Sequence, residues 1–309
     1  NKYGVPLSLF NLKKNDEFGV FEIGMDRKGE IDYLSKIIKP DLGVITNISY
    51  AHARNFRNIE QIALAKSEII NNIKNNGNLV LNADDQFYDF HKKIGQRKNL
   101  KICSFSLNKK ASEINLDFIQ KEKLKYKVNI NINKSKKYFY LNSKFNKDIK
   151  NLLAAVSIIS IFKDIRKLDS NIFYNHKMPD GRGDVSKIKI FKKNFYLMDE
   201  SYNSNPLSLK SALKNFDMIK VNNFKKHLIL GDMLELGKHS KKLHKAISID
   251  INNTSINSVN VVGKYIKETY KNLNKNKKGI ILKNNSQIIN LIKNNIDNND
   301  YLMIKGSNS

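Results

Sequence analysis

Two adjacent carboxylates and a polar turn mark the stretch of this sequence with the strongest chemical character. The apolar run Phe195–Met198 is typical of a buried strand and leads directly into Asp199 and Glu200. The turn after them ends at Asn205, a good N-cap, and Pro206, which favours the first turn of a helix. Ligands of open α/β sheets bind outside the carboxyl ends of strands, beside helix N-termini. The stretch therefore predicts a site for a phosphorylated ligand, although a surface loop with an ordinary cap also explains these residues taken alone.

Three other side chains lie near the ends of expected strands in the first half of the chain. Glu22 lies in the apolar run Phe18–Ile23, where that strand is expected to end. His52 lies in the loop after the next strand, and Lys66 lies on the helix that follows this loop. A Mg²⁺ ion held by few protein groups, phosphates and water fits such positions. Each residue alone is weak evidence, because a single histidine is more often a hydrogen-bonded structural residue and a helix lysine is usually solvent-facing.

Helical and strand patterns alternate along the first half of the sequence. We expect helices over Gly29–Ile38, Ile59–Ile73 and Asp84–Lys93, and strands over Phe18–Ile23, Leu42–Thr46, Asn78–Leu81 and Lys101–Phe105. This alternation predicts a mostly parallel sheet. Period-two patterns then predict antiparallel strands around Leu116–Ile119, Tyr126–Ile132 and Lys137–Leu141, followed by a core-facing helix over Ile149–Phe162.

A turn-rich segment, Met178–Asp184, is the expected linker between domains 1–178 and 179–309. After it the alternation restarts, which predicts a second, Rossmann-like α/β domain. Its strands are expected at Lys187–Phe191, Phe195–Met198, His227–Leu230, Val259–Val262, Gly279–Leu282 and Tyr301–Ile304. Its helices are expected near Pro206–Ile219, Lys238–Asp250, Lys264–Leu273 and Ser286–Asn294.

Composition excludes several classes of protein. No apolar run approaches the roughly 18 residues of a membrane span. The single cysteine, Cys103, excludes an internal disulfide and a cysteine-cluster metal site, and it fits a cytoplasmic protein. The net charge of +26 comes from lysines spread along the whole 309-residue chain, without a nucleic-acid-binding motif. We interpret it as compositional bias that also favours anionic ligands, and we expect neither a nucleic-acid partner nor membrane insertion.

The sequence contains no Gly-x-x-x-x-Gly-Lys-[Ser/Thr] phosphate loop. It begins at Asn1 without a methionine and stops at Ser309, just after an expected strand. We therefore expect a piece of a longer protein that is inactive alone, because nothing in it would hold the β- and γ-phosphates of a nucleotide. From its residues alone, the sequence indicates two α/β domains with an anionic ligand where they meet.

Segments along nearly the whole chain resemble the Mur ligase family. They are Asn1–Leu7, Glu22–Ile31, Thr46–Ile48 with Ala51-His52, Ala65–Ile69, Asn82–Asp84, Asn151–Ala155, Gly181–Gly183, Asp199–Pro206, Gly231–Gly237 and Lys305–Ser307. The resemblance implies an ATP-dependent amide ligase, represented here by its central nucleotide-binding and C-terminal domains without the N-terminal domain and P-loop. The presence of both the Asp199–Pro206 and the Gly231–Gly237 motifs implies one branch of the family. Its members join D-alanyl-D-alanine to UDP-N-acetylmuramoyl-tripeptide through an acyl phosphate in peptidoglycan synthesis.

The resemblance also assigns roles to residues of this sequence. It implies ATP and Mg²⁺ as cofactors and a monomeric enzyme. Glu22, His52 and Lys66, the lysine as a carbamate, would hold Mg²⁺, and His52 and Lys66 would serve catalysis. The nucleotide would meet Asn151 at the adenine, Arg182 at phosphate, Asp199 at the ribose and Tyr202 by packing. Weaker candidates on the amine-substrate side are Asn203, Asn205 and Ser307.

Three positions depart from the family pattern: Ala53-Arg54 after His52, Lys147-Asp148 before Asn151, and Arg27. None of them removes a metal ligand, although the second puts details of the adenine site in question. Another amide ligase of the superfamily, using a folate or a different amino acid, is an alternative that the two branch motifs disfavour. A basic nucleic-acid-binding protein is the alternative from another class, and steep salt dependence of DNA binding without a nucleotide requirement would support it.

Overall fold

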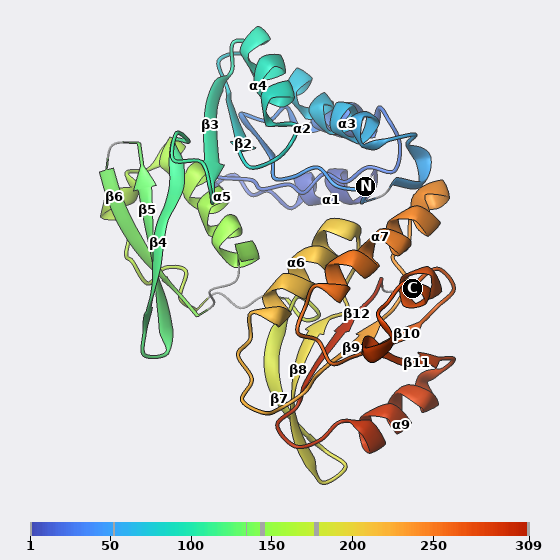
Figure 1. Cartoon of the computed structure of the whole chain (residues 1–309). Helices are drawn as coiled ribbons and strands as arrows, with labels where there is room; N and C mark the ends of the chain where they lie inside the picture. Colours follow the sequence, from blue (N-terminus) through green and yellow to red (C-terminus); the bar gives the residue numbers. More distant parts are fainter. Residues whose placement is uncertain (1, 52, 134, 143–145, 176–178, 308–309) are drawn as a thin grey trace. The chain divides into compact units, whose positions relative to one another are not determined.

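Two compact units make up the chain in this computed structural model, which describes residues 2–51, 53–133, 135–142, 146–175 and 179–307 (Figure 1). The first unit comprises Asn1–Ile48 with Asn55–His176, and the second comprises Ser49–Arg54 with Lys177–Ser309. Each unit is built around its own six-stranded sheet. The predicted domain boundary at Met178 falls on residues 176–178, outside the described ranges, and it stays a prediction.

The first unit has a mixed sheet with strand order β1-β2-β3-β4-β5-β6. Neighbouring strands run parallel from β1 to β4 and antiparallel from β4 to β6. The strands are β1 (Leu42–Ile45), β2 (Asn78–Asn82), β3 (Lys101–Ser106), β4 (Ile114–Glu122), β5 (Lys125–Ile132) and β6 (Ser135–Leu141). Parallel strands followed by added antiparallel strands confirm the fold predicted for this half.

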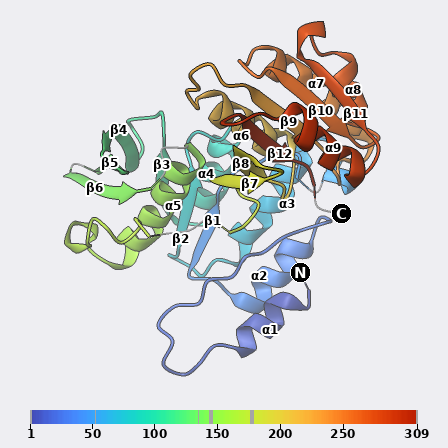
Figure 2. The same cartoon turned by 90° about the horizontal axis from the view of Figure 1, so that it is seen from below.

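Helices cover this sheet and supply its core. They are α1 (Gly4–Phe10), α2 (Glu30–Ile38), α3 (Ile59–Asn72), α4 (Tyr88–Arg97) and α5 (Asn146–Phe162). The expected stripe of α5 is buried, with Leu153 and Val156 in one cluster with Phe105 of β3 and Phe139 of β6. At the start of the chain, α1, which the sequence did not predict, packs against α2 (Figure 2).

Two sequence predictions for this unit were wrong. Phe18–Ile23 is irregular backbone rather than a strand, and Val20 is almost fully exposed. A strand needs a hydrogen-bonded neighbour, and β1 is the outer strand of this sheet among the described residues. The helix expected from Asp84 begins at Tyr88, because the Asp85 carboxylate accepts the Phe87 amide at 2.9 Å and holds a turn first.

The second unit has a sheet with strand order β11-β10-β9-β12-β8-β7. All its neighbours run parallel except the β7–β8 hairpin. The strands are β7 (Asp184–Ile190), β8 (Lys193–Glu200), β9 (Lys226–Leu230), β10 (Ser258–Val262), β11 (Lys278–Leu282) and β12 (Tyr301–Lys305). The helices are α6 (Pro206–Asp217), α7 (Ser240–Asn252), α8 (Lys267–Lys271) and α9 (Asn285–Asn295).

The last strand, β12, decides where loops meet in the second unit. The chain leaves β8 through α6, forms β9, β10 and β11, and returns through α9 to insert β12 between β9 and β8. Helices α6 and α7 lie on one face of the sheet and α9 lies on the other (Figure 1). The loops after β8, β9 and β12 therefore meet at one carboxyl edge, where ligands of doubly wound sheets bind. Within the described ranges, no helix combines the length and apolar character needed to cross a bilayer.

Candidate functional site

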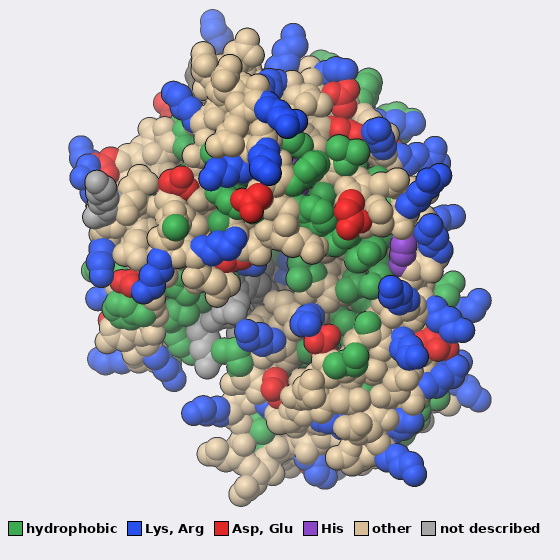
Figure 3. Space-filling model, turned by 45° about the horizontal axis from the view of Figure 1, so that its top comes forward, with side chains coloured by type: hydrophobic (Ala, Val, Ile, Leu, Met, Phe, Trp, Pro, Cys, Tyr) green, Lys and Arg blue, Asp and Glu red, His purple; other side chains and the backbone are tan. Residues whose placement is uncertain are grey.

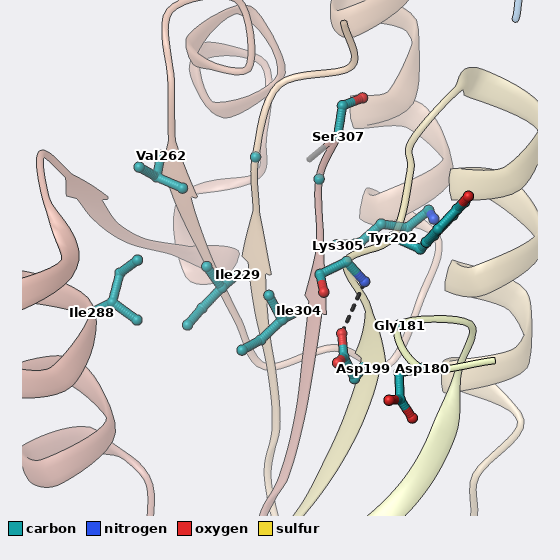
Figure 4. Close-up of a pocket in the computed structure, with 13 residues that line it drawn as sticks. Asp180, Gly181, Asp199, Tyr202, Ile229, Val262, Ile288, Ile304, Lys305 and Ser307 are labelled. Atoms are coloured by element: carbon teal, nitrogen blue, oxygen red, sulfur yellow. Dashed lines mark hydrogen bonds between the residues drawn. The ribbon is translucent and has the colours of Figure 1, made fainter. Parts of the chain in front are cut away.

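A cavity of about 450 Å³ opens at the carboxyl edge of the second sheet (Figure 4). Acidic, aromatic, aliphatic and hydroxyl side chains line it, including those of Asp180, Asp199, Tyr202, Ile229, Ile304 and Ser307. These residues come from the turn before β7 and from the ends of β8, β9 and β12. Three of them are predicted site residues, which this edge brings together: Asp199, Tyr202 and Ser307.

Asp199 faces the cavity because of its register in the sheet. It pairs with Ile304 of β12, which pairs in turn with Ile229 of β9, so the three side chains occupy one row on one face. The Asp199 carboxylate accepts the Ser201 amide at 2.9 Å, and its carbonyl accepts the Gly183 amide at 2.5 Å. A carboxylate fixed beside aliphatic side chains suits a ligand with both hydroxyl groups and an apolar ring.

Arg182 and Tyr202 form a stacked pair next to Asp199. The Arg182 guanidinium carbon lies 4.4 Å from the centre of the Tyr202 ring, a cation–π arrangement. The Tyr202 amide donates to the Gly181 carbonyl at 3.1 Å. Gly181 has φ +73°, and a Cβ there would lie 2.8 Å from the Tyr202 nitrogen. Only glycine fits this contact, so the turn before β7 and the turn after β8 present the pair together.

Ser307 joins three loops of the rim by its own hydrogen bonds. Its hydroxyl accepts the Leu234 amide at 3.0 Å and donates toward Asn203 Oδ1 at 3.3 Å and the Ser204 carbonyl at 3.1 Å. Its amide donates to the Asp232 carbonyl at 3.0 Å. These contacts make Ser307 an organiser of the rim, and its predicted contact with the amine substrate stays a prediction.

Asn205 is the N-cap of α6, as the sequence predicts. Its side-chain oxygen accepts the Ser208 amide at 2.9 Å, and the Ser208 hydroxyl accepts the Asn205 amide at 3.0 Å, a reciprocal capping box. Pro206 is the first helical residue. The cap uses the backbone amide and the side-chain oxygen of Asn205. Its side-chain nitrogen, Nδ2, is therefore the group that suits a substrate contact.

The glycines that end two strands allow the sheet edge to close tightly. The Gly231 amide donates to the Lys305 carbonyl at 2.7 Å, and a Cβ on Gly231 would lie 3.2 Å from the Gly306 Cα. The next residue, Asp232, anchors a further loop, since its carboxylate accepts three consecutive amides at 2.7 to 2.9 Å, those of Lys264, Tyr265 and Ile266. The sequence located this rim of small and polar residues but not the anchoring role of Asp232.

His244 supports the same rim from α7, and sequence reasoning missed it. Its Nε2 accepts the Met233 amide at 2.9 Å, so the proton lies on Nδ1, which donates to the Ser240 carbonyl at 2.7 Å. Burial lowers the pKa of His244, opposed by its bond to Ser240 and by the Asp232 charge. A neutral imidazole with both nitrogens engaged is structural. Its signal in the sequence is its helical spacing from Ser240, which many surface helices share.

The first unit places Lys66 in a partly buried position on α3. Its ammonium donates to the Asn47 carbonyl at 3.1 Å. Burial lowers the Lys66 pKa, and the Asp85 charge opposes this effect. The Asp85 carboxylate also accepts the Ile48 amide at 2.7 Å, which ties the end of the β1 loop to the turn before α4. An amine with a lowered pKa is the chemical property that a reactive lysine requires.

Two other predicted residues of the first unit, Glu22 and Asn151, lie on different segments. Glu22 is exposed on the irregular segment before α2, and Asn151 is exposed on α5. His52 lies outside the described residues. Among the residues that are described, no three His, Cys, Asp or Glu side chains gather as a metal site. A set of Glu22, His52 and a modified Lys66 therefore stays a prediction.

Comparison with protein families identifies the chain. Residues 1–159 match the model of the Mur ligase middle domain, and residues 189–308 match that of the Mur ligase glutamate ligase domain. The chain belongs to the Mur ligase family. The first sheet and all of the second sheet except most of β7 fall within these matches, so the Mur ligase fold accounts for the two α/β units.

Individual Mur ligases are similar over nearly the whole chain. It is 30% identical to the UDP-N-acetylmuramoyl-tripeptide–D-alanyl-D-alanine ligase of Rickettsia prowazekii, covering 99% of this chain and 67% of the relative. It is 31% identical to the enzyme of that name from Buchnera aphidicola subsp. Baizongia pistaciae, covering 100% and 65%. The chain thus spans about two thirds of the length of these relatives.

Solved Mur ligase structures share the fold. A crystal structure of MurF from Acinetobacter baumannii matches with a TM-score of 0.85 at 23% identity, covering 98% of this chain and 65% of the other. MurF from Thermotoga maritima, solved in complex with ADP, matches with a TM-score of 0.81 at 24% identity, covering 99% and 67%. The two mostly parallel sheets predicted from the sequence are therefore confirmed as a Mur ligase architecture.

Proposed function

We propose that this chain supplies the nucleotide-binding and amine-binding parts of an ATP-dependent ligase that joins D-alanyl-D-alanine to UDP-N-acetylmuramoyl-tripeptide. The enzyme would act in the cytoplasm, in peptidoglycan synthesis. Membership of the Mur ligase family and the names of the two relatives support this proposal. The structural observation that carries it is the cavity at the carboxyl edge, which Asp199 and Tyr202 line and where Arg182 stacks on Tyr202.

The chemistry of this rim fits a nucleoside phosphate. Asp199 is a hydrogen-bond acceptor for ribose hydroxyls, and the adjoining Ile229 and Ile304 offer an apolar surface. The Tyr202 ring provides a flat face, and the Arg182 guanidinium carries a permanent positive charge for phosphate. Asn151, exposed on α5, is the candidate for the adenine edge because an amide both donates and accepts.

Lys66 fits the role of a carbamate ligand to Mg²⁺, together with Glu22 and His52. The lowered pKa leaves a larger fraction of the amine unprotonated. The neutral nitrogen attacks CO₂, a C–N bond forms, and one proton leaves, so that a cation becomes an anionic oxygen donor. When bound, Mg²⁺ would neutralise phosphate charge. A carbamate suits this ion because Mg²⁺ prefers hard oxygen ligands.

In the proposed reaction, ATP phosphorylates the terminal carboxylate of the tripeptide. The dipeptide amine then attacks this acyl phosphate, a C–N bond forms, phosphate leaves with the C–O electron pair, and the nitrogen releases one proton to the solvent. This chain's own groups would act by positioning the reactants and balancing their charge, the main sources of catalysis in phosphoryl transfer. Asn203, Ser307 and the Asn205 amide are candidates for holding the amine substrate at the rim.

The opposing proposal, a basic nucleic-acid-binding protein, has less support. Lysine and arginine side chains are scattered over the face shown in Figure 3, with other side chains between them. A nucleic-acid-binding face usually gathers its positive charge into one patch or stripe.

Replacing Asp199 tests the proposed function. In the complete gene product, we expect Asp199→Asn to raise the KM for ATP at least tenfold, because a hydrogen bond to a charged group contributes about 1.5–3 kcal/mol. The assay is phosphate release that requires both UDP-N-acetylmuramoyl-tripeptide and D-alanyl-D-alanine. Asp250→Asn, which removes an acid paired with Lys210 away from the cavity, is the control and should leave the KM unchanged. Phosphate release that does not depend on D-alanyl-D-alanine would contradict the proposal.

A further inference from the structure

Lys305, the last residue of β12, is a buried cation directly beneath the rim. Only 2% of it is exposed. Its ammonium donates to the Asn203 carbonyl at 2.9 Å and to the Glu200 carbonyl at 3.3 Å, and it lies 3.5 Å from the Glu200 carboxylate. One side chain thus holds both ends of the turn Glu200–Asn203, which follows β8.

This turn carries Tyr202 and begins next to Asp199, yet regular structure does not hold it. Residues 201 to 205 form neither helix nor strand. Tyr202 is 56% exposed, so burial of its ring contributes little to its position. An ammonium has three donors and a charge that draws carbonyl oxygens to one point. The contacts of Lys305 therefore fix the two ends of this turn, and the Ser201–Asp199 and Tyr202–Gly181 hydrogen bonds hold its middle.

We propose that Lys305 is a positioning residue for nucleotide binding. Its ammonium holds the Glu200–Asn203 turn in the conformation in which Asp199 and Tyr202 face the cavity. The inference rests on the proposed function, because it concerns the nucleotide side of the same site. It adds a residue of the cavity lining whose ammonium acts through the two carbonyls it binds.

A second buried lysine of the same unit serves as a control that distinguishes an effect on the nucleotide site from a loss of stability. Lys226, the first residue of β9, is likewise 2% exposed. Its ammonium donates to the Asp217 carbonyl at 2.7 Å and to the Ser255 hydroxyl at 3.1 Å. It lies at the amino end of its strand, whereas the cavity is at the carboxyl edge. Losing either lysine leaves buried acceptors unsatisfied, but only Lys305 supports the rim.

The test compares Lys305→Met with Lys226→Met in the complete gene product. ADP is titrated by isothermal calorimetry, and urea unfolding is followed in parallel. We expect both variants to lower the urea midpoint, and Lys305→Met alone to weaken ADP binding at least tenfold. A second variant, Lys305→Met with Glu200→Gln, removes the buried charge that faces Lys305 and should recover stability without recovering ADP affinity, because the two carbonyls still lack the Lys305 donor. It also serves if the single variant fails to fold.

The outcomes separate the inference from the function on which it rests. Unchanged ADP affinity in the Lys305 variants, or equal weakening in Lys226→Met, would overturn the positioning role while the proposed function stands. Recovery of ADP affinity together with stability in the double variant would show that Lys305 serves stability only. Absence of ADP binding by the wild-type protein would overturn both.

Discussion

Lys66 in the first unit and Lys305 in the second are both removed from solvent, fully or in part, yet their surroundings suit them to different roles. Lys66 in the first unit donates to one carbonyl, that of Asn47, and burial lowers its pKa. Lys305 in the second unit meets two carbonyls and the carboxylate of Glu200. Burial favours the neutral, reactive amine of Lys66, whereas the two carbonyls and the carboxylate around Lys305 use its ammonium as a hydrogen-bond donor. Burial beside one described acceptor thus suits Lys66 to chemistry, whereas burial among three oxygen atoms suits Lys305 to support.

The largest effect that this comparison predicts is on activity. Lys66→Ala in the complete gene product should reduce amide-bond formation at least a thousandfold while the urea midpoint changes little, because among the described residues the lost ammonium has one hydrogen bond, to the Asn47 carbonyl. Lys98→Ala is the matched control, since burial also lowers the Lys98 pKa and its ammonium also donates to a carbonyl, that of Asn71. It should retain activity. An active Lys66→Ala variant would remove Lys66 from the proposed site.

The chemical state of Lys66 can be observed directly. With ¹³C-bicarbonate, the complete gene product should show a carbamate carbon signal in NMR spectra that disappears in Lys66→Ala and persists in Lys98→Ala. The signal should weaken as pH falls, because protonation removes the nucleophilic amine. A wild-type spectrum without the signal at alkaline pH would contradict the carbamate and leave the nucleotide contacts of the second unit unaffected.

The two units also differ in their buried histidines, which predicts a moderate effect of pH on stability. Burial lowers the pKa of His91 in the first unit and of His227 and His244 in the second, with Asp300 opposing the effect at His227. The unfolded chain then binds more protons below the ordinary histidine pKa of about 6.5, so stability is lost as pH falls through and below that value. Each histidine contributes at most about 1.4 kcal/mol per pH unit.

Urea unfolding at pH 5.5 and 7.5 checks this expectation. The second unit, with two such histidines among the residues that the structure describes, should lose more stability than the first. His227→Gln should flatten the pH dependence of the second unit, because glutamine does not titrate. If the stability of the second unit depended equally on pH in the wild type and in His227→Gln, His227 would not be the source of the pH dependence.

The smallest effect concerns Cys103, which gives a probe of the first unit alone. Burial raises its pKa to about 11, with Glu113 adding to the effect. The thiol should therefore react slowly with iodoacetamide at pH 8 and rapidly once urea opens the first unit. If the second unit unfolds first at low pH, the thiol should remain protected under those conditions. Rapid labelling of the native protein would contradict the burial of β3.

Local features of the sequence predicted the parts of the site that depend on neighbours in the chain. The strand that leads into Asp199 and Glu200, the cap at Asn205 and the helix from Pro206 all follow from residues within one short stretch. The strand expected at Phe18–Ile23 failed for the opposite reason, since an apolar pattern does not determine whether a partner strand lies alongside. The start of α4 was misplaced because the side chain of Asp85 competes for a backbone amide.

By itself, the sequence determined the alternation of strands and helices and the motifs that mark the family, because periodicity and capping act over a few residues. Only the tertiary structure decided that β12 lies between β8 and β9, and therefore that Lys305 reaches Glu200 and Asn203, which lie 105 and 102 residues earlier. Contacts at that separation depend on strand order and register, which arise from packing of the whole sheet. The side chains that could bind a nucleotide could thus be predicted from the sequence, whereas the supporting contacts of the Lys305 ammonium could not.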